Sequence, residues 1–256
     1  MILDKVKEEF VKDLVKKGKR PDGRQFMEYR PIKIETGIIP NAEGSALAEI
    51  GDTKVLCGVK IDVLAPFADR PEEGVVMVNA EFSPIAHPDF EPGPPNEYSI
   101  ELARVVDRAI RSAESVDTKK LFLEEGKVMG VFLDVYVLDH DGNLIDCAAL
   151  AAMAALLHTR VPKYADGKII RTEFAGPLEI RRKAVSVSFE NIEGVFLADA
   201  TNEEEVASSG RLSLGVSDDG FFCSGQKSGK AGLMKEQMVE LMEKAAEQAK
   251  FLFQQL

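Results

Sequence analysis

The segment at residues 144–159 restricts the fold of this chain more than any other stretch. It reads LIDCAALAAMAALLHT, and small apolar residues run through it without forming a separate polar face. A helix that is apolar on all sides is a buried helix, and its small side chains allow it to lie close against a sheet. Its only charge before Arg160 is Asp146, near the start, where the helix dipole favours an acid. The sequence therefore predicts a buried helix packed against a sheet.

Strand and helix patterns alternate along the rest of the chain. A first amphipathic helix is predicted at 2–17, with Leu3, Val6, Phe10 and Leu14 on its apolar face. A second is predicted at 96–115 with Asn96 as its N-cap, and a third from about Ser228 to the end. Short runs rich in β-branched residues predict strands at 45–50, 54–62, 75–82, 128–139, 184–189, 194–199, 211–216 and 220–224.

Strands followed by helices thus occur twice, which indicates an α+β architecture of two related lobes packed as layers. We expect an N-terminal helix and arm at 1–24, a first lobe at 25–162, and a second lobe with the C-terminal helix at 163–256. Residues 161–183 are expected to connect the lobes.

Composition limits the classes of function. No run approaches the roughly 18 apolar residues of a membrane helix, and the charged first 17 residues are unlike a signal peptide, so we expect a cytoplasmic protein. Cys57, Cys147 and Cys223 form no C-x-x-C pair. The chain has no dinucleotide fingerprint and no phosphate loop, so we expect no cofactor and no metal. A net charge of −11 means that any nucleic-acid contact must come from a small basic site or from a partner chain.

A series of short motifs carries a resemblance to a known family. The series comprises Arg20-Pro21-Asp22-Gly23-Arg24, Arg30, Gly37, Ala42-Glu43-Gly44-Ser45-Ala46, Gly51-Asp52-Thr53-Lys54-Val55-Leu56 and Asp139-His140-Asp141-Gly142. At these spacings it resembles the ribonuclease PH family, and the resemblance continues over nearly the whole chain. It implies the ribonuclease PH fold, two related lobes of mixed β-sheet packed with helices. The segment at 101–108, ELARVVDR, is most similar to the non-catalytic ribonuclease-PH-like subunit of the archaeal exosome core ring.

Phosphorolysis of RNA requires cationic or backbone N–H donors that hold a free phosphate. It also requires carboxylates that act as general acids or bind a metal ion. In active family members a Gly-Thr-Arg or Gly-Ser-Arg turn begins the central helix and grips phosphate with backbone donors, the helix dipole and the Arg. Here the turn reads Gly142-Asn143-Leu144-Ile145, so two aliphatic residues replace the hydroxyl and the Arg. The resemblance therefore implies a chain that is inactive by itself.

A second difference lies in the second lobe, where active members place paired aspartates after a Glu-Asp pair. An ungapped comparison puts Ser209 and Arg211 at those aspartate positions, and no Asp occurs between Asp199 and Asp218. Glu204 and Glu205 keep the earlier pair. Three consecutive acids, Glu203 to Glu205, favour a solvated turn over a metal site, because neighbouring loop acids rarely all face one point. We expect no catalytic residue in this chain.

Arg104, Arg108 and Arg111 are the candidate RNA-binding residues. Positions i, i+4 and i+7 place them on one face of the predicted 96–115 helix. The alternative is an ordinary surface face of mixed charge, in which Glu101 pairs with Arg104 and Asp107 pairs with Arg111. This alternative gives Arg108 no acidic partner and therefore explains that residue least well. The resemblance implies that two arginines of this helix point at RNA near the active site of a sister subunit. Arg181-Arg182-Lys183 is interpreted as an exposed edge or an interface.

The resemblance also implies partners. They are a catalytic ribonuclease-PH-like subunit in a hexameric ring with three of each chain, RNA-binding cap proteins, and single-stranded RNA that is degraded or tailed at its 3′ end. Two other hypotheses remain open: an autonomous phosphate-dependent 3′-5′ exoribonuclease with a divergent site, and a purely structural ring scaffold. The Gly142–Ile145 turn argues against the first, and the arginine helix argues against the second.

Overall fold

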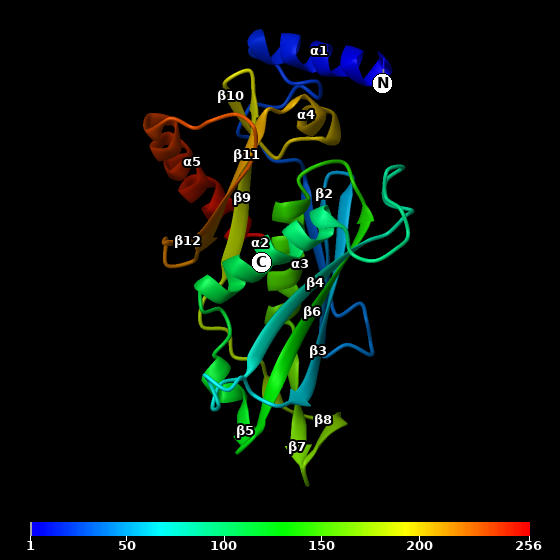
Figure 1. Ribbon diagram of the computed structural model, residues 1–256, viewed down its shortest axis with the longest axis vertical. Helices are drawn as coiled ribbons and strands as arrows, with labels where there is room; N and C mark the ends of the chain where they lie inside the picture. The colour runs from blue at the N-terminus through cyan, green and yellow to red at the C-terminus, as the bar shows by residue number, and fades with distance from the viewer. Residues whose placement is uncertain (1) are drawn as a thin grey trace.

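Two β-sheets enclose the alanine-rich helix (Figure 1). The computed structural model describes the backbone of residues 2–256 and the side chains from residue 5 onward. The larger sheet has the order β1-β2-β3-β6-β4, with β5 added beside β6. Its strands are β1 (Ile32–Thr36), β2 (Gly44–Ile50), β3 (Thr53–Leu64), β4 (Val75–Phe82), β5 (Phe122–Glu124) and β6 (Lys127–Asp139). Neighbours are antiparallel except β4, which runs parallel to β6, so the sheet is mixed.

The smaller sheet is antiparallel and has the order β10-β9-β11-β12. Its strands are β9 (Ala184–Ile192), β10 (Val195–Ala198), β11 (Gly210–Ser217) and β12 (Phe222–Gly229). The C-terminal helix α5 (Lys235–Phe253) packs on β9 and β11 through Leu241, Ala245, Ala249 and Leu252. Every residue of β9 is buried because helices and sheet neighbours cover both of its faces.

Helix α3 (Leu144–Leu157) lies between the sheets and contacts β2, β3 and β9. All of its residues from Ile145 to Leu156 are buried, which confirms the prediction from its composition. Its C-terminal end comes so near to β2 that a Cβ on Gly44 would lie 2.1 Å from Thr159 Oγ1. Glycine is therefore required at this point of the sheet. The predicted α+β fold of two packed lobes is confirmed.

Helix α2 (Glu97–Ser112) covers β4 and also contacts β12 of the second sheet. The Asn96 side chain accepts a hydrogen bond from Ser99 N, as the sequence predicted for an N-cap. After α2, the 3₁₀ helix η1 (Thr118–Leu121) leads into β5. Helix α2 therefore contacts both sheets, and its residues near β12 lie beside the second lobe.

Two segments are more structured, or structured differently, than the sequence indicated. Residues 161–183, predicted to connect the lobes, include most of β7 (Arg160–Ala165) and all of β8 (Lys168–Pro177), which form an antiparallel hairpin. The predicted boundary between residues 162 and 163 lies within β7. The last helix begins at Lys235, whereas Ser228 lies in β12 and pairs with Arg211.

The N-terminal helix α1 (Ile2–Lys16) forms as predicted but uses a different face. Val11 and Val15 are buried against Ile192, Leu197 and Ala207, whereas Val6 and Phe10 are more than half exposed. Leu3 lies outside the residues whose side chains the structure describes. Helix α1 therefore packs on the second lobe, on α4 (Asn202–Ala207) and the β9–β10 hairpin. In the part of the chain that the structure describes, no helix combines the length and apolarity needed to cross a bilayer.

Candidate functional site

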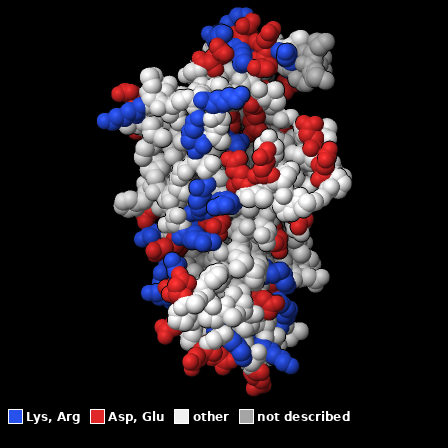
Figure 2. Space-filling view, in the orientation of Figure 1, with Lys and Arg blue, Asp and Glu red and all other residues white. Residues whose placement is uncertain are grey.

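The exposed side of α2 carries the three arginines that the sequence singled out. Arg104, Arg108 and Arg111 are all exposed, while Leu102, Val105, Val106, Ala109 and Ile110 of the same helix are buried. On the face drawn in Figure 2, Lys and Arg side chains gather over α2 near the middle of the molecule, with acidic side chains beside them. The structure therefore places the three arginines on one surface of a firmly packed helix.

The three guanidinium groups differ in what holds them. Arg111 donates to Asp107 Oδ1 at 2.8 Å, so a carboxylate neutralises it, as the alternative interpretation expected. Arg108 donates from Nη2 to the amide oxygen of Gln226 at 2.6 Å and from Nε to the backbone oxygen of Arg104 at 3.3 Å. The Arg104 guanidinium has no ion pair or hydrogen bond with any residue from Lys5 to Leu256. The expected Glu101–Arg104 pair does not form, and Glu101 Oε1 accepts from Gln226 Nε2 at 3.4 Å.

A cleft of about 810 Å³ opens beside the N-terminal half of α2. Its aromatic and aliphatic lining includes Phe82, His87, Phe90, Tyr98, His140, Leu144 and Ile145. Its polar lining includes Glu101, Glu190, Asn202, Glu205, Ser208, Ser209, Arg211 and Lys230. The two segments that depart from the active pattern, 142–145 and 209–211, thus meet at one cleft, although they are more than 60 residues apart in sequence.

The start of α3 offers this cleft little to hold an anion. Leu144 is half-buried, Ile145 is buried, and neither side chain has a donor. Asn143, in the left-handed conformation with φ 56°, donates its backbone N–H to Glu205 Oε1 at 2.8 Å. One of the free N–H groups at the helix start is therefore already satisfied by a carboxylate of this chain.

Two glutamates share one arginine on the cleft wall. Arg211 Nη1 lies 3.6 Å from Glu190 and 3.8 Å from Glu205. Burial, and then the charge of Glu205, raises the pKa of Glu190 to about 8. Burial also raises the pKa of Glu205. Arg211 is thus already engaged by carboxyl groups of this chain, which leaves it less available to a free phosphate dianion.

The interpretation of Glu203 to Glu205 as a solvated turn was wrong. These residues form α4, and only Glu203 is exposed at the surface, where it binds Lys7 at 2.9 Å. Glu204 is fully buried against Arg20. Among residues 5–256, no three His, Cys, Asp or Glu side chains are grouped so that they could hold a metal ion.

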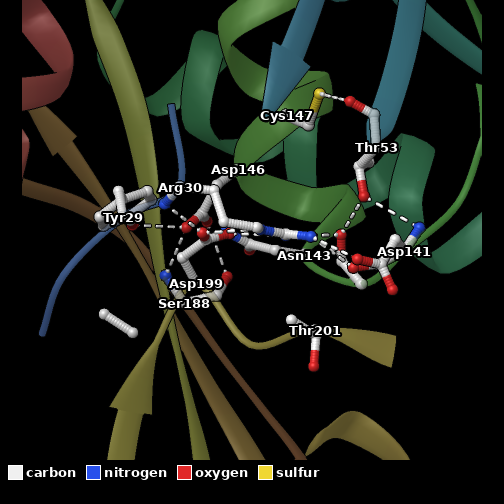
Figure 3. A network of polar contacts seen from close by, with 12 residues as sticks. Tyr29, Arg30, Thr53, Asp141, Asn143, Asp146, Cys147, Ser188, Asp199 and Thr201 are labelled. Atoms are coloured by element: carbon white, nitrogen blue, oxygen red, sulfur yellow. Dashed lines mark hydrogen bonds and ion pairs between the residues drawn. The ribbon is translucent and has the colours of Figure 1, made fainter. Parts of the chain in front are cut away.

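Arginines of the N-terminal arm, and Arg30 shortly after it, are bound by the protein itself. Arg30 and Arg24 both contact the Asp199 carboxylate at 2.8 Å, and Arg20 donates to the backbone oxygens of Ala198 and Asp199. Asn143 donates to the same Asp199 carboxylate at 2.9 Å, and Figure 3 shows Arg30, Asn143 and Asp199 together at the start of α3. Asp199 therefore ties the arm, the central helix and the second lobe together, a role that the sequence analysis missed.

Asp146 forms a second buried centre in the same view. Its carboxylate accepts from Tyr29 Oη at 2.7 Å, Ser188 Oγ at 2.8 Å and Ser188 N at 3.1 Å (Figure 3). Burial raises the pKa of this carboxyl to about 6, although these hydrogen bonds act in the opposite direction. The one acid of the alanine-rich helix therefore joins Tyr29, which follows the arm, to β9, and the helix dipole is not its only stabilising partner.

Comparison with known proteins agrees with this architecture. Residues 28–162 match the model of the 3′ exoribonuclease family, domain 1, and residues 184–248 match domain 2 of the same family. This chain belongs to the ribonuclease PH family.

Relatives within the ribonuclease PH family are similar over nearly their full length. The chain is 42% identical over 259 residues to the exosome complex component Rrp42 of Methanothermobacter thermautotrophicus, covering 100% of this chain and 96% of that protein. It is 44% identical over 243 residues to Rrp42 of Pyrococcus horikoshii, covering 93% and 88%.

Two solved structures share the fold. A chain from the Archaeoglobus fulgidus exosome with RNA bound to the active site superposes with a TM-score of 0.94 at 42% identity, covering 99% of both chains. A chain of an archaeal exosome core gives a TM-score of 0.88 at 40% identity, covering 98% of this chain and 96% of that chain. The predicted resemblance to a ribonuclease-PH-like exosome subunit is confirmed.

Proposed function

We propose that this chain is a non-catalytic component of an exosome core. It forms a hexameric ring with a catalytic sister subunit, three of each, contributes RNA binding beside the sister's active site, and carries RNA-binding cap proteins on the ring. The assembled ring degrades RNA from its 3′ end by phosphorolysis and adds tails in the reverse direction. The names of the relatives and of the two solved structures support the assembly.

The residues that line the cleft are the observation that supports the non-catalytic part of the proposal. Leu144 and Ile145 stand where phosphate must be gripped, and Glu190 and Glu205 surround the single Arg211. Charge stabilisation by donors placed in advance is the main source of rate enhancement in such transfers. The aliphatic helix start supplies no such donor, and Arg211 is already engaged by two acids.

The surface of α2 supports the RNA-binding part. Arg104 and Arg108 keep their full charge at the surface, because no carboxylate pairs with either among the described residues. Arg111 is the weaker candidate, since Asp107 already neutralises it. Arg181 and Arg182 are also paired, with Asp117 and Asp219. We therefore assign the principal RNA contacts to Arg104 and Arg108.

Several large apolar side chains at the surface support assembly with other subunits. Ile85 is 84% exposed, Phe221 71% and Tyr98 64%, besides Val6 and Phe10 on α1. Exposed apolar residues of this size are typical of surfaces that are covered in a complex.

Mixing tests the proposal directly. The purified chain, its catalytic sister and the two together are assayed for shortening of a single-stranded RNA with and without inorganic phosphate. We expect no phosphate-dependent decay from the chain alone and more decay from the mixture than from the sister alone. Phosphate-dependent decay by the chain alone would establish the hypothesis of an autonomous exoribonuclease. A mixture no more active than the sister alone would favour the hypothesis of a purely structural scaffold.

A further inference from the structure

Strand β12 of the second lobe contributes a side chain to the arginine surface of α2. The Gln226 amide lies between Arg108 and Glu101, which are seven residues and therefore about two turns apart on one side of that helix. Its oxygen Oε1 accepts from Arg108 Nη2 at 2.6 Å, and its nitrogen Nε2 donates to Glu101 Oε1 at 3.4 Å. One neutral side chain thus bridges an arginine and a glutamate across 118 and 125 residues of sequence.

The two partners fix the orientation of this amide. If the Gln226 side chain turned over, its NH₂ group would face the guanidinium and its oxygen would face the Glu101 carboxylate. Both contacts would be repulsive, because a guanidinium only donates and an ionised carboxylate only accepts. Glu101 therefore holds the amide oxygen toward Arg108, and the amide oxygen holds the guanidinium.

Arg108 remains able to bind an anion while it is held in this way. A guanidinium has five N–H donors, and the bonds to Gln226 and to the Arg104 backbone use one donor each. Three donors remain on an exposed side chain, enough for a two-point contact with a phosphate. A carboxylate partner would neutralise the charge, as Asp107 does for Arg111, whereas an amide leaves it intact.

We propose that Gln226 is a positioning residue for RNA binding, which holds the Arg108 guanidinium ready for a phosphate of the RNA backbone. This inference rests on the proposed RNA contact of Arg108. A long side chain that is free in solution loses rotamer freedom when it binds, and fixing it beforehand removes part of that loss. The second lobe therefore contributes to RNA affinity without contacting RNA through Gln226 itself.

The test uses the reconstituted ring and a single-stranded RNA, with the dissociation constant measured over a range of salt concentrations. Gln226→Met keeps the length of the side chain and removes both polar groups. We expect it to weaken RNA binding roughly two- to tenfold while leaving the salt dependence unchanged, since no charge is lost. Gln255→Met is the matched control and should bind as wild type does, because this half-buried glutamine lies just beyond α5 and its side chain donates to the Phe251 backbone oxygen.

A double-mutant cycle with Arg108→Met separates positioning from general support of the fold. Arg108→Met should weaken binding and lower the salt slope by about one, and adding Gln226→Met should then have no further effect. Light scattering confirms that each ring has assembled. If the Gln226→Met variant fails to assemble, Gln226→Ala is used in its place. If Arg108→Met binds RNA normally, the proposed function of Arg108 is wrong. If Arg108→Met weakens binding but Gln226→Met does not, or if the two effects add in full, the positioning role is wrong.

Discussion

Arg20 and Glu204 form a two-point ion pair in which neither side chain has any exposed surface. Arg20 Nη2 lies 2.6 Å from Oε2 and Nε lies 2.8 Å from Oε1, across 184 residues of sequence. Removing one partner of a buried pair leaves the other charge without compensation, which is far more costly than losing a surface pair. The arm and the second lobe are therefore joined by a contact that tolerates little change.

Glu204→Gln should lower the free energy of unfolding by about 3–5 kcal/mol, because the buried Arg20 charge loses its counter-charge. Denaturant unfolding of the purified chain measures this change. Glu203→Gln is the control on the same helix, since Glu203 pairs with Lys7 at the exposed surface, and its effect should stay below about 1 kcal/mol. Equal effects of the two substitutions would contradict the role given to burial.

Glu190→Gln should change how stability depends on pH. Burial raises the Glu190 pKa from 4.5 to about 8, so the folded state binds this proton more tightly than the unfolded state does. The resulting stability is fully present below about pH 4.5 and is lost as the pH rises toward 8. A glutamine cannot ionise, so the variant should lose less stability than wild type between pH 5 and pH 8, by more than about 1 kcal/mol. Glu193→Gln, in the exposed turn after the same strand, should follow wild type.

Replacing both Arg104 and Arg108 with Glu should weaken RNA binding by the assembled ring for every sequence tested. Phosphate contacts carry no sequence information, and each lost contact should lower the log–log salt slope by roughly one. The ring should still form, because exposed arginines add little to packing. Arg182→Glu is the control, since Arg182 is already paired with Asp219 at 2.9 Å. A double variant that assembles, binds RNA and supports decay like wild type would favour a purely structural scaffold.

The chain should associate with its sister into a closed ring. Alternating subunits make head-to-tail contacts that are satisfied only when the ring closes. Light scattering should show an incomplete assembly for the chain alone and a defined hexamer for the mixture. A stable monomer that ignores the sister would exclude the ring.

The parts of the fold that were predicted from sequence are those whose cause is local. The burial of α3 follows from its own composition, and the N-cap of α2 follows from Asn96 before a run of helix formers. The face of α1 was mispredicted because Val11 and Val15 satisfy helical spacing as well as Val6 and Phe10 do. Only the position of α4 and of the β9–β10 hairpin decides between the two faces.

The same distinction applies to the candidate site. The arginines of α2 and the altered turn at 142–145 could be found because each lies within one short segment. The start of α5 was placed too early because Gly229 continues β12 through its pairing with Gly210, a contact between distant segments. Asp199 and Gln226 gave no local signal, since their roles depend on partners more than 50 residues away.

The docking of α1 and the arm has a consequence for biosynthesis. Val11 and Val15 pack on Ile192, Leu197 and Ala207, and Arg20 pairs with Glu204, so these early residues lack most of their partners until about residue 207 has been made. At typical translation rates of about 5–20 residues per second, this delay is roughly 10–40 seconds. The sheet strands β1 to β6 and helix α3 leave the ribosome during that interval and can pair among themselves. The residues that are synthesised first therefore reach their final contacts later than strands β1 to β6 and helix α3 can.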